Sequence, residues 1–224
     1  VQKIEKDVLF QVEELDLSEQ EVSQDKIREL EATFNAFEFD LTSPPFFKVK
    51  LVRISKDETI MMFNVHHIIS DGWSLSVLVQ EVMNNYNNIA TNVPLKQEQK
   101  SIQYVDYVDW LTTKLNGEFG EKGRQFWSEK KFEDIEPINL PIDYTRPEIN
   151  SFEGSSLRYY FSDDFYQKLE RFSGRNQTTV FNLYRAVLNI ALHKWSNREQ
   201  IVIGTPVAGR TSTQLNDQIG LYIN

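Results

Sequence analysis

The stretch from Thr59 to His66 is apolar on both faces, and a short loop joins it to a helix predicted from Ser74 to about Asn85. A strand with two apolar faces is typical of the centre of a sheet that is covered on both sides. Apolar side chains alternate with lysines in residues 47–51, and a turn at 55–58 joins the two segments as a hairpin. A hairpin that continues into a helix predicts a mixed α/β fold.

Further helices and strands are predicted on both sides of this unit. Apolar residues recur at steps of three and four in segments typical of helices, and alternate with polar residues in segments typical of half-buried strands. The helices are predicted at about 19–36, 102–115 and 178–194, and the strands at 8–12, 157–161 and 201–205.

A proline-rich stretch separates two parts of the chain. Residues 133–155 contain three prolines and a glycine, which predict an extended connection. We therefore predict an N-terminal lobe at 1–140, a connection at 141–155 and the beginning of a C-terminal lobe at 156–224. Because strand-like residues stand close to both ends, we expect a segment of a longer protein, with the first lobe nearly complete and the second partial.

The composition excludes several classes of function. The formal net charge is −9, and the acidic residues are spread along the sequence without a basic stripe, so nucleic acid is not an expected partner. The chain has no cysteine, which removes disulfides, thiolate nucleophiles and cysteine-based zinc sites, and fits a reducing compartment. No apolar run approaches the roughly 20 residues that cross a bilayer. We expect no membrane partner and a cytoplasmic location.

Two of the three histidines are adjacent, at the end of the apolar strand. If the strand persists to His67, alternation points His66 and His67 in opposite directions, so the pair cannot easily hold one metal ion. An imidazole beside a loop with a flexible Gly72 suits a base presented into a cleft. Asp71 stands at the start of the following helix, whose dipole stabilises a carboxylate. The alternative is that both histidines are satisfied core residues and that Asp71 only caps the helix; we expect this structural role for His193, which lies in an amphipathic helix without polar company.

This run matches HHxxxDG and resembles the motif of the condensation domains of nonribosomal peptide synthetases. The motif alone identifies a wider acyltransferase superfamily, whose fold is similar to chloramphenicol acetyltransferase. Other segments resemble further condensation-domain motifs in the right order. They are Phe39-Asp40-Leu41 with Pro45-Phe46-Phe47, the YxDYxxW run from Tyr104 to Trp110, Leu140-Pro141-Ile142-Asp143 with Arg146-Pro147, Gly204 to Arg210, and the terminal IGLYIN.

The resemblance implies a fold and a reaction. The fold is an α/β, two-lobed chloramphenicol acetyltransferase-like sandwich. The reaction is amide bond formation between a donor acyl or peptidyl thioester and the amine of an acceptor aminoacyl thioester. No cofactor binds directly, since both substrates are carried on the 4'-phosphopantetheine of carrier domains. The implied partners are upstream and downstream peptidyl carrier domains and a neighbouring adenylation domain.

The resemblance also assigns the site residues. His67 is the catalytic histidine, in a site that includes His66, Asp71 and Gly72, and no metal is expected. We expect Asp71 to pair with Arg210 across the junction of the lobes as structural support. The substrate channel is assigned to Trp73, Ser74 and Asn224, although packing is favoured over a substrate contact for Trp73. For Tyr104, Tyr107 and Trp110 the helical spacing favours core packing.

Three other functions share much of this pattern. A stand-alone acyltransferase that uses coenzyme A would present the same phosphopantetheine arm to a similar channel. An epimerization domain also carries HHxxxDG, but the YxDYxxW match disfavours it. An inactive condensation-like module that recruits another protein would have no need of a histidine in a cleft.

Overall fold

The computed structural model describes residues 4–5, 7–95, 102–130, 135–151 and 154–224. Their contacts form two compact units. The first contains residues 1–114 together with 206–224, and the second contains residues 115–205. Residues 206–224 thus belong with the N-terminal part of the chain. The lobe boundaries predicted at 140 and 156 concern a complete domain and stay a prediction.

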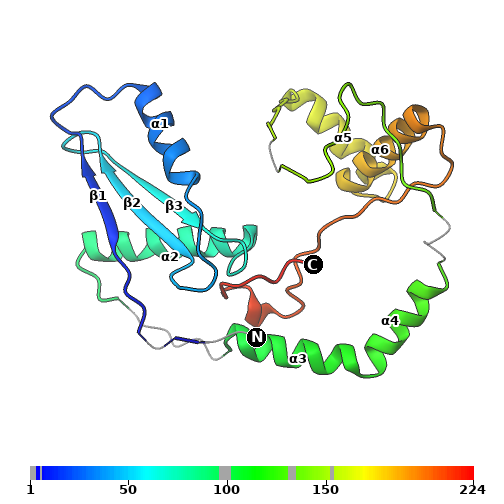
Figure 1. Ribbon diagram of the computed structural model, residues 1–224, viewed down its shortest axis with the longest axis horizontal. Helices are drawn as coiled ribbons and strands as arrows, with labels where there is room; N and C mark the ends of the chain where they lie inside the picture. Colours follow the sequence, from blue (N-terminus) through cyan, green and yellow to red (C-terminus); the bar gives the residue numbers. More distant parts are fainter. Residues whose placement is uncertain (1–3, 6, 96–101, 131–134, 152–153) are drawn as a thin grey trace. The chain divides into compact units, whose positions relative to one another are not determined.

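A three-stranded sheet is the centre of the first unit. β1 (Val12–Asp16) pairs in parallel with β2 (Phe47–Arg53), which pairs antiparallel with β3 (Thr59–Val65), so the strand order is β1-β2-β3 (Figure 1). Parallel neighbours need a crossover connection, and α1 (Gln24–Asn35) lies in the connection between β1 and β2. The side chain of Ser23 caps this helix by accepting the Lys26 N–H.

The central position predicted for the 59–66 strand is wrong within the described residues. β2 holds the centre and β3 is an edge strand. One face of β3 packs against α1, where Met62, Val52 and Phe34 form a buried cluster. The opposite face includes Met61, which is 37% exposed. The pattern of apolar residues indicates how many faces of a strand are shielded from water. It does not indicate whether the strand pairs with a neighbouring strand on both sides.

Two more helices complete the first unit. α2 (Gly72–Ala90) follows β3 through a short loop, and α3 (Tyr104–Asn116) carries the YxDYxxW residues. A short 3-10 helix, η2 (Thr213–Leu215), lies in the segment 206–224. Leu215 of η2 is buried with Tyr107 and Tyr222, which ties this segment to α3. The helices predicted at 19–36, 74–85 and 102–115 are confirmed with shifted ends.

Among its described residues, the second unit is helical where it has regular structure. It contains α4 (Glu118–Ser128), α5 (Asp163–Arg175) and α6 (Val180–Ser196). The helix predicted at 178–194 is confirmed as α6, whereas α4 and α5 were not predicted. The strands predicted at 157–161 and 201–205 are wrong, because these residues have no regular structure. The strand predicted at 8–12 begins only at Val12, where pairing with β2 starts.

Candidate functional site

His66 is fixed at the end of β3 by its backbone and its ring. Its N–H donates to the carbonyl of Phe46 at 2.9 Å, and its Nδ1 accepts the N–H of Ile68 at 3.0 Å. Because Nδ1 accepts, the neutral ring carries its proton on Nε2. The ring also lies nearly perpendicular to that of Phe39, with centroids 6.0 Å apart. His66 is therefore a half-buried histidine whose contacts hold the start of the loop.

His67 differs from His66 in being exposed. β3 has ended at Val65, and the chain turns at His67, whose carbonyl accepts the N–H of Ser70 at 3.4 Å. Among the described residues, none forms a hydrogen bond with its ring. The alternative of a satisfied core histidine does not hold for His67, because the residue is exposed.

Asp71 closes the loop as a buried carboxylate and as the cap of α2. It is 4% exposed, and its Oδ1 accepts the backbone N–H of Ser74 at 2.8 Å and the hydroxyl of Ser74 at 2.7 Å. Its Oδ2 accepts the N–H of Tyr222 at 3.0 Å. Burial would raise the pKa of Asp71, but these hydrogen bonds and the charge of Arg210 together outweigh it and hold the pKa below its usual value.

The expected pair between Asp71 and Arg210 is present. Nη2 of Arg210 lies 3.4 Å from Oδ1 of Asp71, and the two side chains are 2% and 3% exposed. Nη1 donates to the carbonyls of Gln218, at 2.9 Å, and of Leu215. The guanidinium carbon lies 4.1 Å from the ring centroid of Tyr222. Both partners belong to the same contact unit, so the pair holds the segment 206–224 to the helix start of α2.

The three residues assigned to the substrate channel differ in exposure. Ser74 is completely buried, so its assignment to a substrate channel is wrong; its hydroxyl bonds to Asp71, Arg210 and Gly220 instead. We call Asp71, Ser74, Arg210, Gly220 and Tyr222 the Asp71 cluster.

Trp73 and Asn224 remain predicted channel residues. Trp73 is 48% exposed, and its indole N–H donates to the carbonyl of Asn216 at 2.9 Å, which ties it to the segment 206–224. Asn224 is exposed and exchanges two backbone hydrogen bonds with Val207.

The tyrosines of the YxDYxxW run pack against the Asp71 cluster, as their spacing indicates, but the core packing predicted for Trp110 is wrong, because this residue is 43% exposed. Tyr104 and Tyr107 lie against Tyr222, with ring centroids 5.2 and 4.7 Å away. The Tyr104 hydroxyl donates to the carbonyl of Leu221 at 2.7 Å, and burial raises its pKa. A Cβ on Gly220 would lie 2.4 Å from the Tyr104 ring, so this glycine permits the close approach.

Sequence reasoning missed the buried partners of Asp71 other than Arg210. Ser74 follows Asp71 by three residues, and this spacing predicts that the Ser74 N–H donates to the side chain of Asp71 at the N-cap. No sequence signal marks the Tyr222 N–H that Asp71 accepts or the Gly220 backbone that Ser74 contacts, because these residues lie 151 and 146 positions away in the chain.

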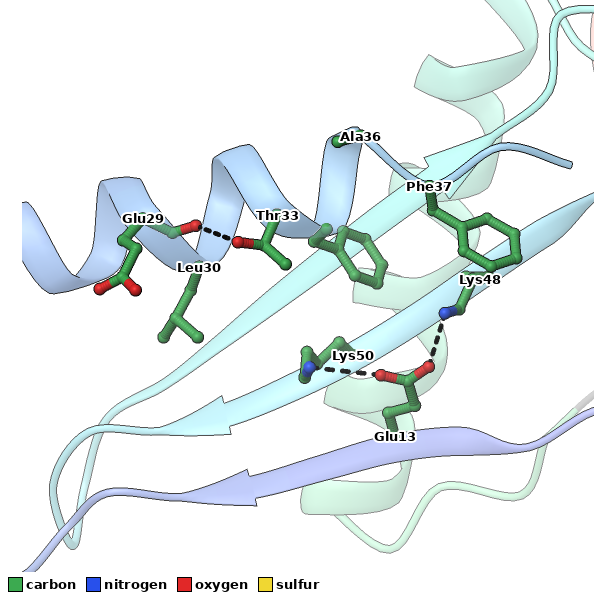
Figure 2. A pocket seen from close by; sticks show the side chains of 9 residues that line it. Glu13, Glu29, Leu30, Thr33, Ala36, Phe37, Lys48 and Lys50 are labelled. Atoms are coloured by element: carbon green, nitrogen blue, oxygen red, sulfur yellow. Dashed lines mark hydrogen bonds and ion pairs between the residues drawn. The ribbon is translucent and has the colours of Figure 1, made fainter.

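A separate pocket of about 470 Å³ lies where α1 meets β1 and β2, and none of the predicted site residues lines it (Figure 2). Glu13 lies between Lys48, at 2.8 Å, and Lys50, at 3.3 Å. The hydrogen bond from Lys48 is the main cause that lowers the pKa of Glu13. Nζ of Lys48 also lies 4.1 Å from the ring centroid of Phe37. These contacts satisfy the lysines within the pocket, which we interpret as structural.

The described residues include no group of three or more histidine, cysteine or carboxylate side chains that could hold a metal ion. Within the same residues, no helix has the length and apolar character needed to span a bilayer.

Acid should weaken the Asp71 cluster in a defined pH range. Because the folded pKa of Asp71 lies below its unfolded value of about 3.9, its stabilising contribution is present in full above that value and is lost as the pH falls through the folded pKa. Asp71→Asn removes this titration. We expect the stability gap between wild type and Asp71→Asn, measured by urea unfolding from pH 6 to pH 3, to shrink as the pH falls. A constant gap would contradict the lowered pKa.

The family described as Condensation domain matches residues 1–224, and the chain belongs to this family. It is 32% identical over 211 residues to gramicidin S synthase 2 of Aneurinibacillus migulanus, covering 94% of this chain and 5% of the relative. It is also 32% identical over 227 residues to bacitracin synthase 3 of Bacillus licheniformis, covering 100% of this chain and 3% of the relative. The chain therefore spans a small part of the curated relatives it matches.

Solved structures confirm the predicted α/β fold class of the chloramphenicol acetyltransferase type. The four-domain nonribosomal peptide synthetase holo-AB3403, bound to AMP and glycine, matches with a TM-score of 0.81 and 25% identity, covering 97% of this chain and 16% of that one. The epimerization domain from the third module of tyrocidine synthetase B matches with a TM-score of 0.83 and 19% identity, covering 97% and 50%.

Proposed function

We propose that this chain catalyses amide bond formation between a donor acyl or peptidyl thioester and the amine of an acceptor aminoacyl thioester, both on carrier domains. The observation that carries the proposal is the contrast between an exposed His67 and the hydrogen bonds that fix its loop on both sides. His66 anchors the start of the loop through Phe46 and Ile68, and Asp71 anchors its end. An exposed imidazole on a fixed loop is suited to meeting a substrate amine.

The chemistry asks for positioning and for one proton acceptor. The acceptor amine attacks the donor carbonyl, the new C–N bond forms, and the C–S bond breaks to release the carrier thiol. A thioester is already activated, so no enzyme nucleophile is needed, in agreement with a chain without cysteine. His67 accepts the proton of the attacking amine or holds that amine by a hydrogen bond. Alignment of two tethered reactants supplies roughly 7–11 kcal/mol in favourable cases.

Gly72 is proposed to let the loop backbone approach the substrate. Its φ is not positive, so a left-handed turn does not explain the glycine, and a Cβ built at this position meets no atom within 4 Å. Gly72→Ala is therefore expected to keep the free energy of unfolding within about 1 kcal/mol of wild type. If substrate passes over residue 72, amide formation falls by about tenfold to a hundredfold. Wild-type turnover in a folded Gly72→Ala protein would remove Gly72 from the site.

Epimerization is the second candidate, because an epimerization domain shares the fold with a TM-score of 0.83. The two reactions leave different products. Condensation joins two substrates, whereas epimerization inverts one Cα and exchanges its hydrogen with solvent. The relatives at 32% identity are named as synthases, and the YxDYxxW run resembles condensation domains, which favours condensation.

The decisive assay uses the full-length protein with separately loaded donor and acceptor carriers in D₂O. Intact-protein mass spectrometry should find the acceptor carrier heavier by the donor acyl group, with no deuterium at the donor Cα. Deuterium gain without transfer would identify an epimerase. Transfer from a coenzyme A thioester, but not from the donor carrier, would identify the stand-alone acyltransferase. If the assay yields neither a transferred acyl group nor a deuterated donor, a recruiting module is favoured.

A further inference from the structure

The direct contact between Arg210 and Asp71 is long for an ion pair. Charge-assisted N–H to carboxylate bonds are typically about 2.7–2.9 Å, and Nη2 of Arg210 lies 3.4 Å from Oδ1 of Asp71. The same Nη2 lies 2.8 Å from the Ser74 hydroxyl oxygen, which lies 2.7 Å from the same Oδ1. The shorter connection between the two charges therefore runs through Ser74.

The Ser74 hydroxyl also holds the backbone of Gly220. Its oxygen accepts the Gly220 N–H at 3.1 Å and lies 2.8 Å from the Gly220 carbonyl. A hydroxyl has one hydrogen and two lone pairs. Both lone pairs are used, by Arg210 and by the Gly220 N–H, and the hydrogen lies between Asp71 and the Gly220 carbonyl. Ser74 is 0% exposed, so water cannot replace any of these partners.

Helix formation alone does not explain a hydroxyl at this position. Asp71 already caps α2 by accepting the backbone N–H of Ser74, which any residue would offer. Alanine has the higher helix propensity. The helix therefore does not need the hydroxyl. Apart from Asp71, all the residues that the hydroxyl contacts are more than 130 positions away.

We propose that Ser74 is a positioning residue, whose hydroxyl joins the Asp71 carboxylate, the Arg210 guanidinium and the Gly220 backbone and so fixes the Asp71 end of the loop that presents His67. This inference rests on the proposed function. Without the hydroxyl, the carboxylate and guanidinium keep only their 3.4 Å contact, and the Gly220 N–H and carbonyl lose a buried partner. The His67 loop then samples orientations in which the imidazole misses the amine.

The test compares Ser74→Ala with Ser76→Ala in the full-length protein. Ser76 lies on the same helix but is exposed, and among the described residues its hydroxyl bonds only to the Gly72 carbonyl of α2. We expect Ser74→Ala to lower kcat for amide formation by about tenfold to a hundredfold, with KM for the acceptor carrier within about twofold of wild type. Ser76→Ala is expected to change neither. A loss of folded protein would also lower the apparent kcat at unchanged KM, so kcat is divided by the folded fraction, which the amplitude of each variant's unfolding transition gives.

A double-mutant cycle with Asp71→Asn tests whether Ser74 acts through the carboxylate. If it does, the kcat losses of the two single variants do not multiply, and the double variant is about as slow as the worse single variant. If the kcat loss of the double variant equals the product of the two single losses, the inference is overturned. Should Ser74→Ala fail to fold, Ser74→Cys, which keeps the size and weakens the hydrogen bonds, takes its place with the same criteria.

The outcomes separate this inference from the proposed function. Wild-type kcat in folded Ser74→Ala and Ser74→Cys, with activity still lost in His67→Ala, overturns only the role of Ser74. Absence of an amide product with the wild-type protein overturns both.

Discussion

Replacing Arg210 with alanine is expected to lower the free energy of unfolding by about 3–5 kcal/mol. The guanidinium is 2% exposed, and its removal leaves Asp71 as a buried carboxylate without a counter-charge. The carbonyls of Leu215 and Gln218 lose their donor in the same step. Urea unfolding of the two proteins at pH 7 measures the difference.

Arg198→Ala is the matched control for this loss. Arg198 also forms an ion pair, with Glu136, but its side chain is 44% exposed and that of Glu136 is 68% exposed. A surface pair of this kind contributes about 0–1 kcal/mol. If Arg210→Ala costs no more than Arg198→Ala, the Asp71 cluster does not hold the segment 206–224 to α2, and the account of the loop anchor is wrong.

His67→Ala is expected to lower kcat for amide formation by about 10²–10⁴-fold, the range that one positioned acid–base group contributes. His67 is exposed and lies in a turn, so truncation removes no buried contact, and the melting temperature should stay close to that of wild type. Product on the acceptor carrier is counted by mass spectrometry in single-turnover mixtures.

His193→Ala is the control histidine. Its ring is exposed on α6, where Nδ1 lies 2.8 Å from the carbonyl of Arg198 just beyond the helix end. The expectation of a core histidine without polar company was therefore wrong for His193, which is exposed and has a backbone carbonyl as its partner. Its loss should leave kcat within about twofold. Equal effects from the two substitutions would point to a general effect of losing a histidine.

The sequence predicts those parts of the fold that depend on local chemistry. α2 begins where Asp71 can cap it, and α1 begins after Ser23, because a side-chain oxygen at the N-cap satisfies a free N–H. α5 carried a similar signal, since Ser162 caps it and two aspartates occupy its first turn. This helix was missed because the alternation of residues 157–161 favoured a strand just before it.

Features that depend on distant partners could not be predicted from local patterns. Leu157 is 98% exposed, and no described strand pairs with residues 157–161, although their alternation is typical of a strand. A strand requires a neighbour for its hydrogen bonds, and periodicity cannot identify one. The pair of Asp71 with Arg210 was predicted only through the resemblance to a family. The role of Ser74 appears only when its partners, more than 130 residues away, are in place.

The most direct test of the central claim measures whether His67 meets the acceptor amine. Diethyl pyrocarbonate modifies exposed imidazoles, and peptide mapping by mass spectrometry separates His67 from His193, which serves as an internal reference within the same protein. We predict that an acceptor carrier loaded with a free aminoacyl group slows the modification of His67 several-fold and leaves His193 unchanged, while an N-acetylated acceptor protects His67 less. Equal modification of His67 with and without the loaded acceptor would contradict the account.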